Sequence, residues 1–529
     1  MNLTSDPWIP VVRTDGHAAL VSLREAFVDG HAIRDLAVRP HERIALMRLL
    51  VCVAQAALDG PTDRTDWRTC AERLPAAASA YLDHWRHTFE LFGKGPRFLQ
   101  TPGIEPSKEE KEGEDDGAGG ALSKLDLTLA SGNNSTLFDN AGGTERRFAP
   151  ARVALMLLAF QNFSASGTSS QARWHGALSA RIANAAPCLA RSMLHTYRHA
   201  DSLLWTLHAN LLTKEQVAML RVAWGVPVWH AMPSGPKDTA SAKNATQSYL
   251  GRLVPLSRLV YLADNGTVIW GQGLRFDPEW REPAATVVIR KDKKGAPVRA
   301  VLSASLDKSL WRELPAISAA VSFAGDSASG PLALAALDRG HEPCDLWAGA
   351  LVASSNAKLL DTVEAVYHLP AGMFVEHEQR LYQDGVRYAE SRALALGKAV
   401  ATYRRELNDE LEGAKFRERG LEVKRKAAMH FWTAVEQHLA ELLGVVEKNE
   451  LLYADGATRA SWHRTAWGQA TQTAARDAYE LACPHTTPRQ LRAYTLGQTT
   501  LLHQPAIASG QEDTMASDTE SDSDLSTEG

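Results

Sequence analysis

A long polar segment, residues 132–147, holds the residue types that could bind nucleic acid. It reads Gly-Asn-Asn-Ser-Thr-Leu-Phe-Asp-Asn-Ala-Gly-Gly-Thr-Glu-Arg-Arg. Amide and hydroxyl side chains can bond to phosphates or base edges, an aromatic ring can stack on a base, and arginines add charge. The candidate contacts are Asn133, Asn134, Thr136, Phe138 and Asn140. The alternative is a surface loop anchored by its one apolar pair, Leu137 and Phe138.

A second polar segment, residues 164–170, follows an apolar helix expected over 153–161 and reads Ser-Ala-Ser-Gly-Thr-Ser-Ser. Small side chains let the backbone amides come close to a nucleic-acid strand. Its candidate contacts are Gly167, Ser169 and Ser170. The alternative is an ordinary serine-rich turn.

Basic residues supply a third kind of candidate. Lys424 and Arg425 belong to a basic run that continues on the helix before them, and such a run is either a solvated face or a path for DNA phosphates. Arg258, with Arg252 and Arg275 nearby, could offer a guanidinium fork to groove acceptors or to phosphate. The alternative for these arginines is a set of surface ion pairs.

No pattern of catalytic residues is recognisable. His195 and His199, with His208 further on, could share a helical face as metal ligands, but no HExxH pattern is completed. The five cysteines form no CxxC pair and are expected to be buried thiols. The sequence therefore predicts neither enzyme activity nor a metal or cofactor. A metal-dependent nuclease or other hydrolase, with acids and histidines that converge only in the fold, stays open as the alternative.

The elements that must position these residues can be read from apolar spacing and turn residues. Two prolines favour a short strand around Trp8, which becomes a core anchor, and a helix with an apolar packing face is expected over 41–58. Strand–turn–strand patterns occur at 258–270 and 287–302, the first around an Asn-Gly turn. These patterns predict antiparallel sheet, and no phosphate-binding glycine motif follows a strand.

The character of the chain changes near residue 370. Residues 1–375 mix strands and helices, whereas residues 376–507 favour long helices, expected over 380–412, 418–443, 457–483 and 488–502. Four helices joined by short loops indicate an up-down bundle. The predicted fold class is therefore α+β, with a large mixed N-terminal domain containing antiparallel sheet and a C-terminal four-helix bundle.

The charge is unevenly distributed. The 529 residues carry a net charge of −5, but residues 105–117 contribute −5 and residues 508–529 contribute −7, so the remainder carries +7. Both acidic segments are poor in apolar residues, and we expect a mobile insert over 105–122 and a disordered tail over 508–529. The composition is that of a soluble globular protein, without a membrane-spanning run or a signal-peptide pattern, which favours a cytoplasmic protein.

Several motifs, in order along the chain, resemble one family. They are Asp6-Pro7-Trp8-Ile9-Pro10-Val11, Leu49-Leu50-Val51-Cys52-Val53-Ala54-Gln55, the segments 96–103 and 132–139, Ala154–Gln161, and Pro187-Cys188-Leu189 with 203–207. Together they resemble the CasA family, the large subunit of the type I-E CRISPR surveillance complex called Cascade. The resemblance covers most of the chain. Some relatives carry a cysteine cluster in mid-chain, which this sequence lacks.

The resemblance implies roles for three segments. Residues 132–147 resemble the loop that approaches the crRNA 5′ handle and the protospacer-adjacent motif (PAM), and residues 164–170 match a glycine-rich loop that reads the PAM minor groove. Only Gly167 remains of its glycines. Residues 349–359 resemble a hairpin whose tip wedges the duplex open, where Ser355 and Asn356 stand in place of the usual glutamine. The lysine of a further PAM-facing loop, near residues 264–267, is missing.

The resemblance also implies partners: crRNA, double-stranded target DNA with a PAM, the backbone, handle-binding and small Cascade subunits, and the CRISPR helicase-nuclease. No membrane partner is implied. The expected function is non-enzymatic PAM recognition, duplex opening with R-loop formation, and recruitment of the helicase-nuclease, while the guide reads the sequence. A structural scaffold without DNA contacts is a further alternative.

Overall fold

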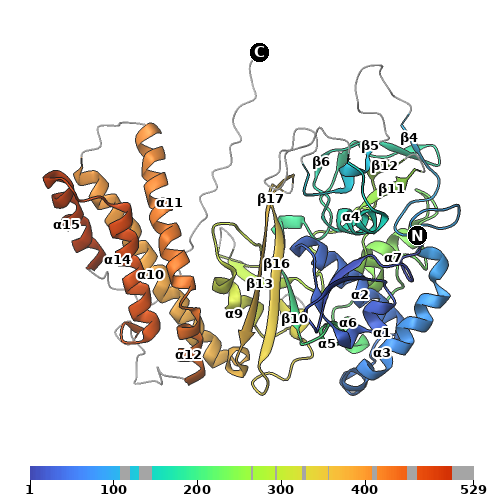
Figure 1. Cartoon of the computed structure of the whole chain (residues 1–529), viewed down its shortest axis with the longest axis horizontal. Helices are drawn as coiled ribbons and strands as arrows, with labels where there is room; N and C mark the ends of the chain where they lie inside the picture. The colour runs from blue at the N-terminus through green and yellow to red at the C-terminus, as the bar shows by residue number, and fades with distance from the viewer. Residues whose placement is uncertain are drawn as a thin grey trace, which may run out of the picture. The chain divides into compact units, whose positions relative to one another are not determined.

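The structure is a computed structural model that describes residues 1–107, 120–129, 146–263, 266–291, 295–323, 329–355, 357–407, 414–448 and 462–502. By its internal contacts the chain divides into two compact units (Figure 1). Unit 1 comprises Met1–Val386 with Leu439–Ala457, and unit 2 comprises Arg387–His438 with Thr458–Gly529. This division falls inside a long helix rather than near residue 370.

Unit 1 begins with a small antiparallel sheet around the predicted N-terminal strand. Strand β1 (Ile9–Arg13) lies between β2 (Ala18–Val21) and β3 (Ile33–Leu36). Trp8 immediately precedes β1 and is 1% exposed, and its indole N–H donates to the Leu3 carbonyl at 2.9 Å. The predicted anchoring role of Trp8 is therefore confirmed.

Helix α2 (Pro40–Ala57) is the central helix of unit 1 and matches the helix expected over 41–58. It starts with proline at its first position, where a missing N–H removes no helical hydrogen bond. Residues 40–55 are all buried, and α2 packs against α3 (Arg64–His84) and α4 (Pro150–Phe163). A helix covered on every side reads as apolar along its length, apart from the charged residues that find partners.

A buried ion cluster joins α2 to helix α8 (Tyr249–Leu253). The carboxylate of Glu282 accepts from Arg48 Nη1 at 2.9 Å and from Arg252 Nε at 2.6 Å. Arg48 also donates to the carbonyls of Leu253 and Arg252. The two guanidinium groups outweigh the opposing effect of burial and hold the pKa of Glu282 below its ordinary value.

The two predicted hairpins are present. Strands β11 (Arg258–Leu262) and β12 (Thr267–Gln272) pair antiparallel, as do β13 (Thr286–Lys291) and β14 (Pro297–Val301). Gly266, in the first turn, has a φ of +81°, the conformation for which glycine is favoured.

A third sheet has the strand order β10-β16-β17, from β10 (His195–His199), β16 (Cys344–Ser354) and β17 (Lys358–Leu369). All its pairs are antiparallel. Figure 1 shows β16 and β17 as a long hairpin, drawn in yellow. β10 pairs only with the first half of β16, from Asp345 to Gly349. The other half of the hairpin therefore continues without this third strand.

The described ranges of unit 1 contain further α-helices and strands. Its helices are α1 (Glu25–Val28), α5 (Leu203–Ala209), α6 (Lys214–Met219), α7 (Thr239–Gln247), α9 (Leu314–Ile317) and α12 (Leu439–Lys448). Its strands are β4 (Ile104–Pro106), β5 (Gly120–Ala121), β6 (Gly167–Thr168), β7 (Ala172–Trp174), β8 (Ala177–Leu178), β9 (Ile182–Ala183) and β15 (Gly330–Pro331).

Unit 2 is helical. It contains most of α10 (Glu376–Glu406), with α11 (Ala414–Glu436), α14 (Ala466–Ala482) and α15 (Pro488–Leu502). Tyr388 on α10 stacks on Trp462 and accepts a hydrogen bond from Gln472 on α14 at 2.9 Å. The α+β fold class with a helical C-terminal region is thus confirmed.

The helix expected over 418–443 is wrong in one respect. α11 ends at Glu436, and α12 begins at Leu439 as a separate helix that belongs to unit 1. The apolar spacing runs on across residues 437–438, but α12, with its buried residues Leu442, Val445 and Val446, groups with unit 1. Periodicity alone does not show which core a helix faces.

The ends of the predicted mobile insert, 105–122, are held in sheets. β4 pairs with β7, and β5 pairs with β12. Residues 108–119 and the predicted tail, 508–529, lie outside the described residues. None of the helices in the described ranges is both long and apolar enough to cross a membrane. All five cysteines are buried and free, as expected.

Candidate nucleic-acid interface

The polar segment 132–147 lies mostly outside the described residues, which resume at Arg146. The predicted contacts Asn133, Asn134, Thr136, Phe138 and Asn140 stay predictions for this reason, as does Asn356. Arg147, just before α4, is exposed. Its guanidinium is thus accessible to a ligand at the beginning of this helix.

The segment 164–170 contains the short strand β6, one side of a short ribbon that is here called the 164–183 ribbon, and is not a simple turn. Within it, β6 pairs antiparallel with β9, with Gly167 opposite Ala183. Gly167 has a φ of +122°, and nothing lies within 4 Å of where a Cβ would stand. The space is open, so the reason for glycine is the backbone conformation.

The remaining candidates of this segment lie on the same ribbon. The N–H of Ser169 donates to the Arg181 carbonyl at 2.9 Å, which extends the pairing by one residue. Ser169 and Ser170 are half-buried, and Thr168 is exposed. The structure therefore leaves Thr168 accessible to a ligand, and Ser169 and Ser170 partly so.

Arg258, a predicted nucleic-acid contact, is a structural residue instead. It is 2% exposed, and its guanidinium donates to the carbonyls of Ser257 at 2.9 Å and Ala165 at 2.7 Å. Burial lowers its pKa to about 10. The Arg258 N–H also donates to the Gln161 side chain at 2.9 Å. The prediction is thus wrong, because these contacts fasten the 164–183 ribbon and the end of α4 to β11.

The two neighbouring arginines, Arg252 and Arg275, differ from each other in exposure. Arg252 is 1% exposed, is paired with Glu282, and lies over the rings of Phe276 and Trp280. Arg275 is exposed. Of these three arginines, only Arg275 can reach a ligand from its position in the structure.

Ser355 lies at the exposed tip of the β16–β17 hairpin. Ser354 is the last residue of β16 and is opposite Lys358, the first of β17, and the Ala357 N–H donates to the Ser354 carbonyl at 3.0 Å. Ser355 has a φ of +52°, which is uncommon for a residue with a side chain. The hairpin that the resemblance implied is therefore present, with Ser355 in its turn.

One residue beside this hairpin was not among the sequence candidates. The Ser192 hydroxyl donates to the Ala353 carbonyl at 3.2 Å and accepts from the Ala353 N–H at 3.0 Å. Arg191 and Ser192 have φ values of 56° and 51°. Neither is glycine or asparagine, so nothing in the local sequence indicates this turn.

Lys424 and Arg425 are exposed on α11, as is Lys426. On α10, Arg405 is exposed, but Arg404 is 7% exposed. The basic run of unit 2 therefore includes three consecutive side chains that a phosphate backbone could approach.

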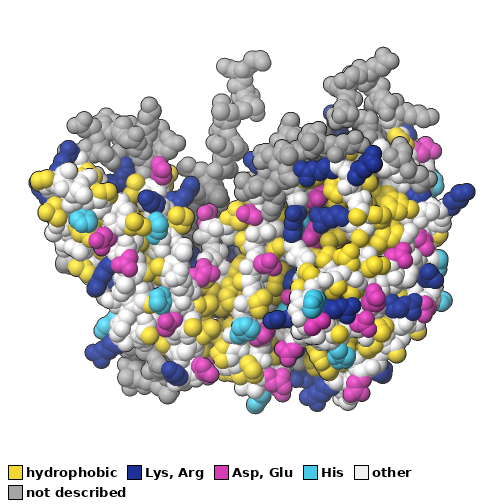
Figure 2. Space-filling view, viewed as in Figure 1, with side chains coloured by type: hydrophobic (Ala, Val, Ile, Leu, Met, Phe, Trp, Pro, Cys, Tyr) yellow, Lys and Arg dark blue, Asp and Glu magenta, His cyan; other side chains and the backbone are white. Residues whose placement is uncertain are grey.

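On unit 1, Lys and Arg side chains also gather on the face shown in Figure 2, between the upper end of the β16–β17 hairpin and α4. A surface of this kind attracts phosphates irrespective of base sequence.

The possible metal ligands do not converge. His195 and His199 lie on strand β10 rather than on a helix, and His195 Nδ1 lies 3.0 Å from the Met193 carbonyl. Burial lowers the pKa of His195 to about 3. His208 Nε2 lies 2.7 Å from the Trp67 carbonyl. Among the described residues, no three His, Cys, Asp or Glu side chains are grouped to hold a metal ion.

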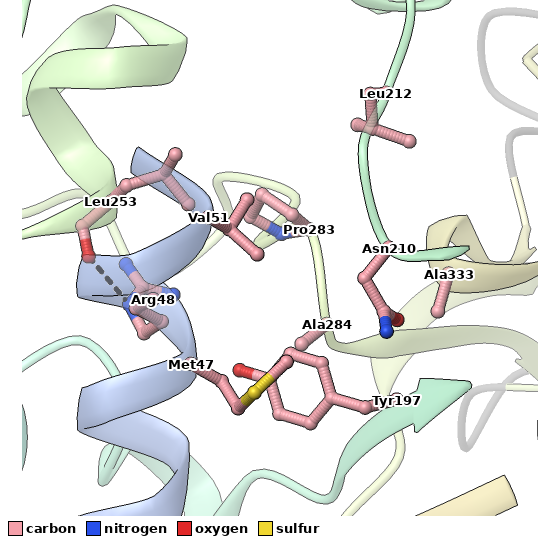
Figure 3. A pocket seen from close by; sticks show the side chains of 10 residues that line it. All are labelled: Met47, Arg48, Val51, Tyr197, Asn210, Leu212, Leu253, Pro283, Ala284 and Ala333. Carbon is pink, nitrogen blue, oxygen red and sulfur yellow. Dashed lines mark hydrogen bonds between the residues drawn. The ribbon is translucent and has the colours of Figure 1, made fainter. Parts of the chain in front are cut away.

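A small pocket beside α2 does not supply an acid–base pair either (Figure 3). Its volume is about 20 Å³, close to the size of one water molecule. Its ionisable groups are Arg48, committed to Glu282 and to the Leu253 carbonyl, and Tyr197, whose pKa is raised by burial. The rest of the lining is Met47, Val51, Asn210, Leu212, Leu253, Pro283, Ala284 and Ala333.

A mixed unit with a long hairpin whose tip is exposed, followed by a helical unit, is a fold shared with solved structures of one class of proteins. The chain is similar to CasA of Thermus thermophilus, with 23% identity and a TM-score of 0.70 over 95% of this chain and 98% of that one. It is similar to Cse1 of Acidimicrobium ferrooxidans, with 20% identity and a TM-score of 0.72 over 95% and 96% of the two chains. A chain of a CRISPR RNA-guided surveillance complex matches at 16% identity and a TM-score of 0.68, over 95% and 99%.

The family follows from sequence. The model of the family "CRISPR-associated protein Cse1" matches residues 2–473, and the chain belongs to this family. The curated CasA/Cse1 protein of Thermus thermophilus is 29% identical over 446 residues, which cover 79% of this chain and 80% of that protein. The predicted family resemblance is thereby confirmed.

Proposed function

We propose that this chain is the large subunit of a type I-E CRISPR surveillance complex. In this proposal it binds crRNA and other Cascade subunits, recognises the PAM in double-stranded target DNA, and promotes duplex opening and R-loop formation. It then recruits the helicase-nuclease and performs no catalysis itself. Family membership and the likeness to a chain of an RNA-guided surveillance complex support its place in such an assembly.

The β16–β17 hairpin is the observation that carries duplex opening. Its strands span 11 and 12 residues, and its exposed turn presents Ser355 beyond the end of β10. A wedge beside a base step needs a stiff support and a narrow tip, because it must replace the stacking that is lost on opening. Strands β16 and β17 supply the support. The turn at Ser355 supplies the tip.

PAM recognition would fall to backbone and small side chains. The 164–183 ribbon presents Gly167 with open space where a Cβ would stand, and buried Arg258 fixes the ribbon at Ala165. A rigid backbone with small side chains fits a narrow groove, where few distinct donors and acceptors are available. The segment 132–147 and Asn356 are proposed as further contacts. Lys424 and Arg425, exposed on α11, would hold a DNA strand through its phosphates.

The first experiment measures binding of target duplex by crRNA-loaded complex with and without this chain. A randomised PAM library is used at fixed salt, with a non-complementary duplex as control. We expect PAM-selective R-loops only when the chain is present. Equal R-loop yield without the chain would overturn the proposal, and binding without PAM preference would reduce it to a scaffold.

A second experiment, on the isolated chain, tests the hydrolase alternative. The isolated chain is incubated with duplex and single-stranded DNA in Mg²⁺ and in Mn²⁺, and the products are compared with an EDTA control. We expect no cleavage. Metal-dependent cleavage that co-purifies with the chain would contradict the non-enzymatic assignment.

A further inference from the structure

The outer half of the β16–β17 hairpin lacks a third strand. The pairing with β10 stops at His195, opposite Gly349, whereas β16 and β17 continue to the pair Ser354–Lys358. A two-stranded ribbon is marginally stable by itself in water. Residues 350–352 are buried, but Ser354 and Ser355 are exposed, so the place of the turn depends on the contacts that Ala353 makes just before it.

Ser192 supplies that contact. The N–H and the carbonyl of one strand residue point to the same side, and a hydroxyl is both donor and acceptor, so one serine can satisfy both groups. The Ser192 hydroxyl accepts from the Ala353 N–H at 3.0 Å and donates to the Ala353 carbonyl at 3.2 Å. These two bonds take the place of strand pairing on the edge of β16 that β10 no longer covers beyond Gly349. They lie at a register shift between Val352 and Ala353.

Ser192 is itself fixed to the structure on its other side. Its carbonyl accepts from the Ala304 N–H at 2.9 Å, and Met193 forms a bridge with Ser303. Residues 191 and 192 both adopt left-handed φ values, which orient the Ser192 side chain toward β16. Non-glycine residues keep such conformations only where the surrounding contacts determine them. The hairpin is therefore tied to a rigid neighbour, one residue before β16 ends.

We propose that Ser192 is a positioning residue that sets the place and stiffness of the hairpin tip, and so determines how readily the complex opens the duplex. This inference rests on the proposed function. Ser192 itself needs no contact with DNA for this role. It acts through Ala353 on the turn at Ser355.

Two substitutions separate the hydroxyl from the backbone strain. Ser192→Ala removes the hydroxyl and keeps the strain, whereas Ser192→Gly removes the hydroxyl and relieves the left-handed conformation. If the hydroxyl is what matters, both variants loosen the tip, although Ser192→Gly should lose less overall stability than Ser192→Ala. Ser248→Ala is the matched control, since the Ser248 hydroxyl also donates to a backbone carbonyl, that of Asn244, and accepts from a backbone N–H, that of Gly251.

The first readout is amide hydrogen exchange of the full chain, which does not depend on DNA. We expect the Ala353 amide and residues 350–355 to exchange about tenfold faster in both Ser192 variants, since a buried hydrogen bond is lost. The Ser248 control should leave this segment unchanged. Wild-type exchange at Ala353 in both Ser192 variants would overturn the proposal.

The second readout uses reconstituted complex and 2-aminopurine beside the PAM. We expect both Ser192 variants to open paired duplex about tenfold more slowly than wild type while binding a duplex already mismatched at that step within about twofold. Equal losses on both substrates, or none, would overturn the positioning role. If wild type opens no duplex, the proposed function fails. The exchange result then shows separately whether Ser192 holds the tip.

Discussion

Two pairs of basic residues, one pair in each unit, have opposite surroundings, although the sequence presents them alike. In unit 1, Arg252 and Arg258 are buried, and their guanidinium groups donate hydrogen bonds to backbone carbonyls or to Glu282. In unit 2, Lys424 and Arg425 are exposed on a helix surface. The buried pair determines the shape of the protein, and only the exposed pair can bind phosphate from its present position. Charge in a sequence therefore indicates a ligand only once its exposure is known.

The largest effect that would test this contrast is expected at Glu282. Glu282→Ala leaves Arg48 and Arg252 buried without their carboxylate, which should lower the free energy of unfolding of unit 1 by about 3–5 kcal/mol. The control is Glu279→Ala, an exposed partner of Arg191, for which a change of about 0–1 kcal/mol is expected. Urea unfolding, followed by tryptophan fluorescence, measures both. Equal effects of the two variants would contradict the buried cluster.

A smaller loss is expected for Arg258→Met. The change removes the donors to the carbonyls of Ser257 and Ala165 and should lower the free energy of unfolding by about 2 kcal/mol. The dependence of DNA binding on salt should keep its slope, because Arg258 neutralises no phosphate. A shallower slope of log affinity against log salt in the variant would show that Arg258 contacts DNA after all.

Acid should destabilise the fold partly through His195. Its folded-state pKa of about 3 is below the ordinary value of 6.5, so the unfolded chain binds the proton more readily. The resulting stability is present above pH 6.5 and is lost as the pH falls from 6.5 toward 3. By about pH 5 the loss is about 2 kcal/mol. His195→Phe should flatten this part of the profile of unfolding free energy against pH. An unchanged profile would contradict the buried, neutral imidazole.

The smallest effect on stability is expected at the exposed pair. Lys424→Ala with Arg425→Ala should change the free energy of unfolding by less than about 0.5 kcal/mol, as is usual for surface residues. If both contact phosphates, the slope of log affinity against log salt should fall by about 2 in magnitude. Filter binding of assembled complex over a salt series measures it. An unchanged slope would show that Lys424 and Arg425 face solvent in the complex and contact no phosphate.

Local signals in the sequence were sufficient for the local parts of the fold. The prolines around Trp8, the Asn-Gly turn before Thr267 and the apolar residues of α2 each act over a few residues, and the structure has the expected strand, hairpin and helix. The end of α11 was not predictable in this way. The helix stops at Glu436 and α12, in the other unit, begins at Leu439, although no helix-breaking residue lies between them.

The candidate site was harder to predict because its residues act over long sequence separations. Arg258 bonds to Ala165, which is 93 residues away, and Ser192 bonds to Ala353, which is 161 residues away. No spacing rule connects such pairs. Ser355 was expected at a hairpin tip from family resemblance, and composition alone gave no indication of it. The burial of Arg252 likewise depends on a carboxylate 30 residues later, at Glu282.

Because the cysteines are distributed over both units, their thiols can serve as native probes of local opening. Four of the thiols, Cys52, Cys70, Cys188 and Cys344, lie in unit 1, and Cys483 lies in unit 2. Burial raises the pKa of each, so little reactive thiolate forms while the surroundings stay closed. Peptide mass spectrometry can follow the rate at which a maleimide labels each thiol. These rates therefore report local opening of the two units separately, in one chain without introduced cysteines.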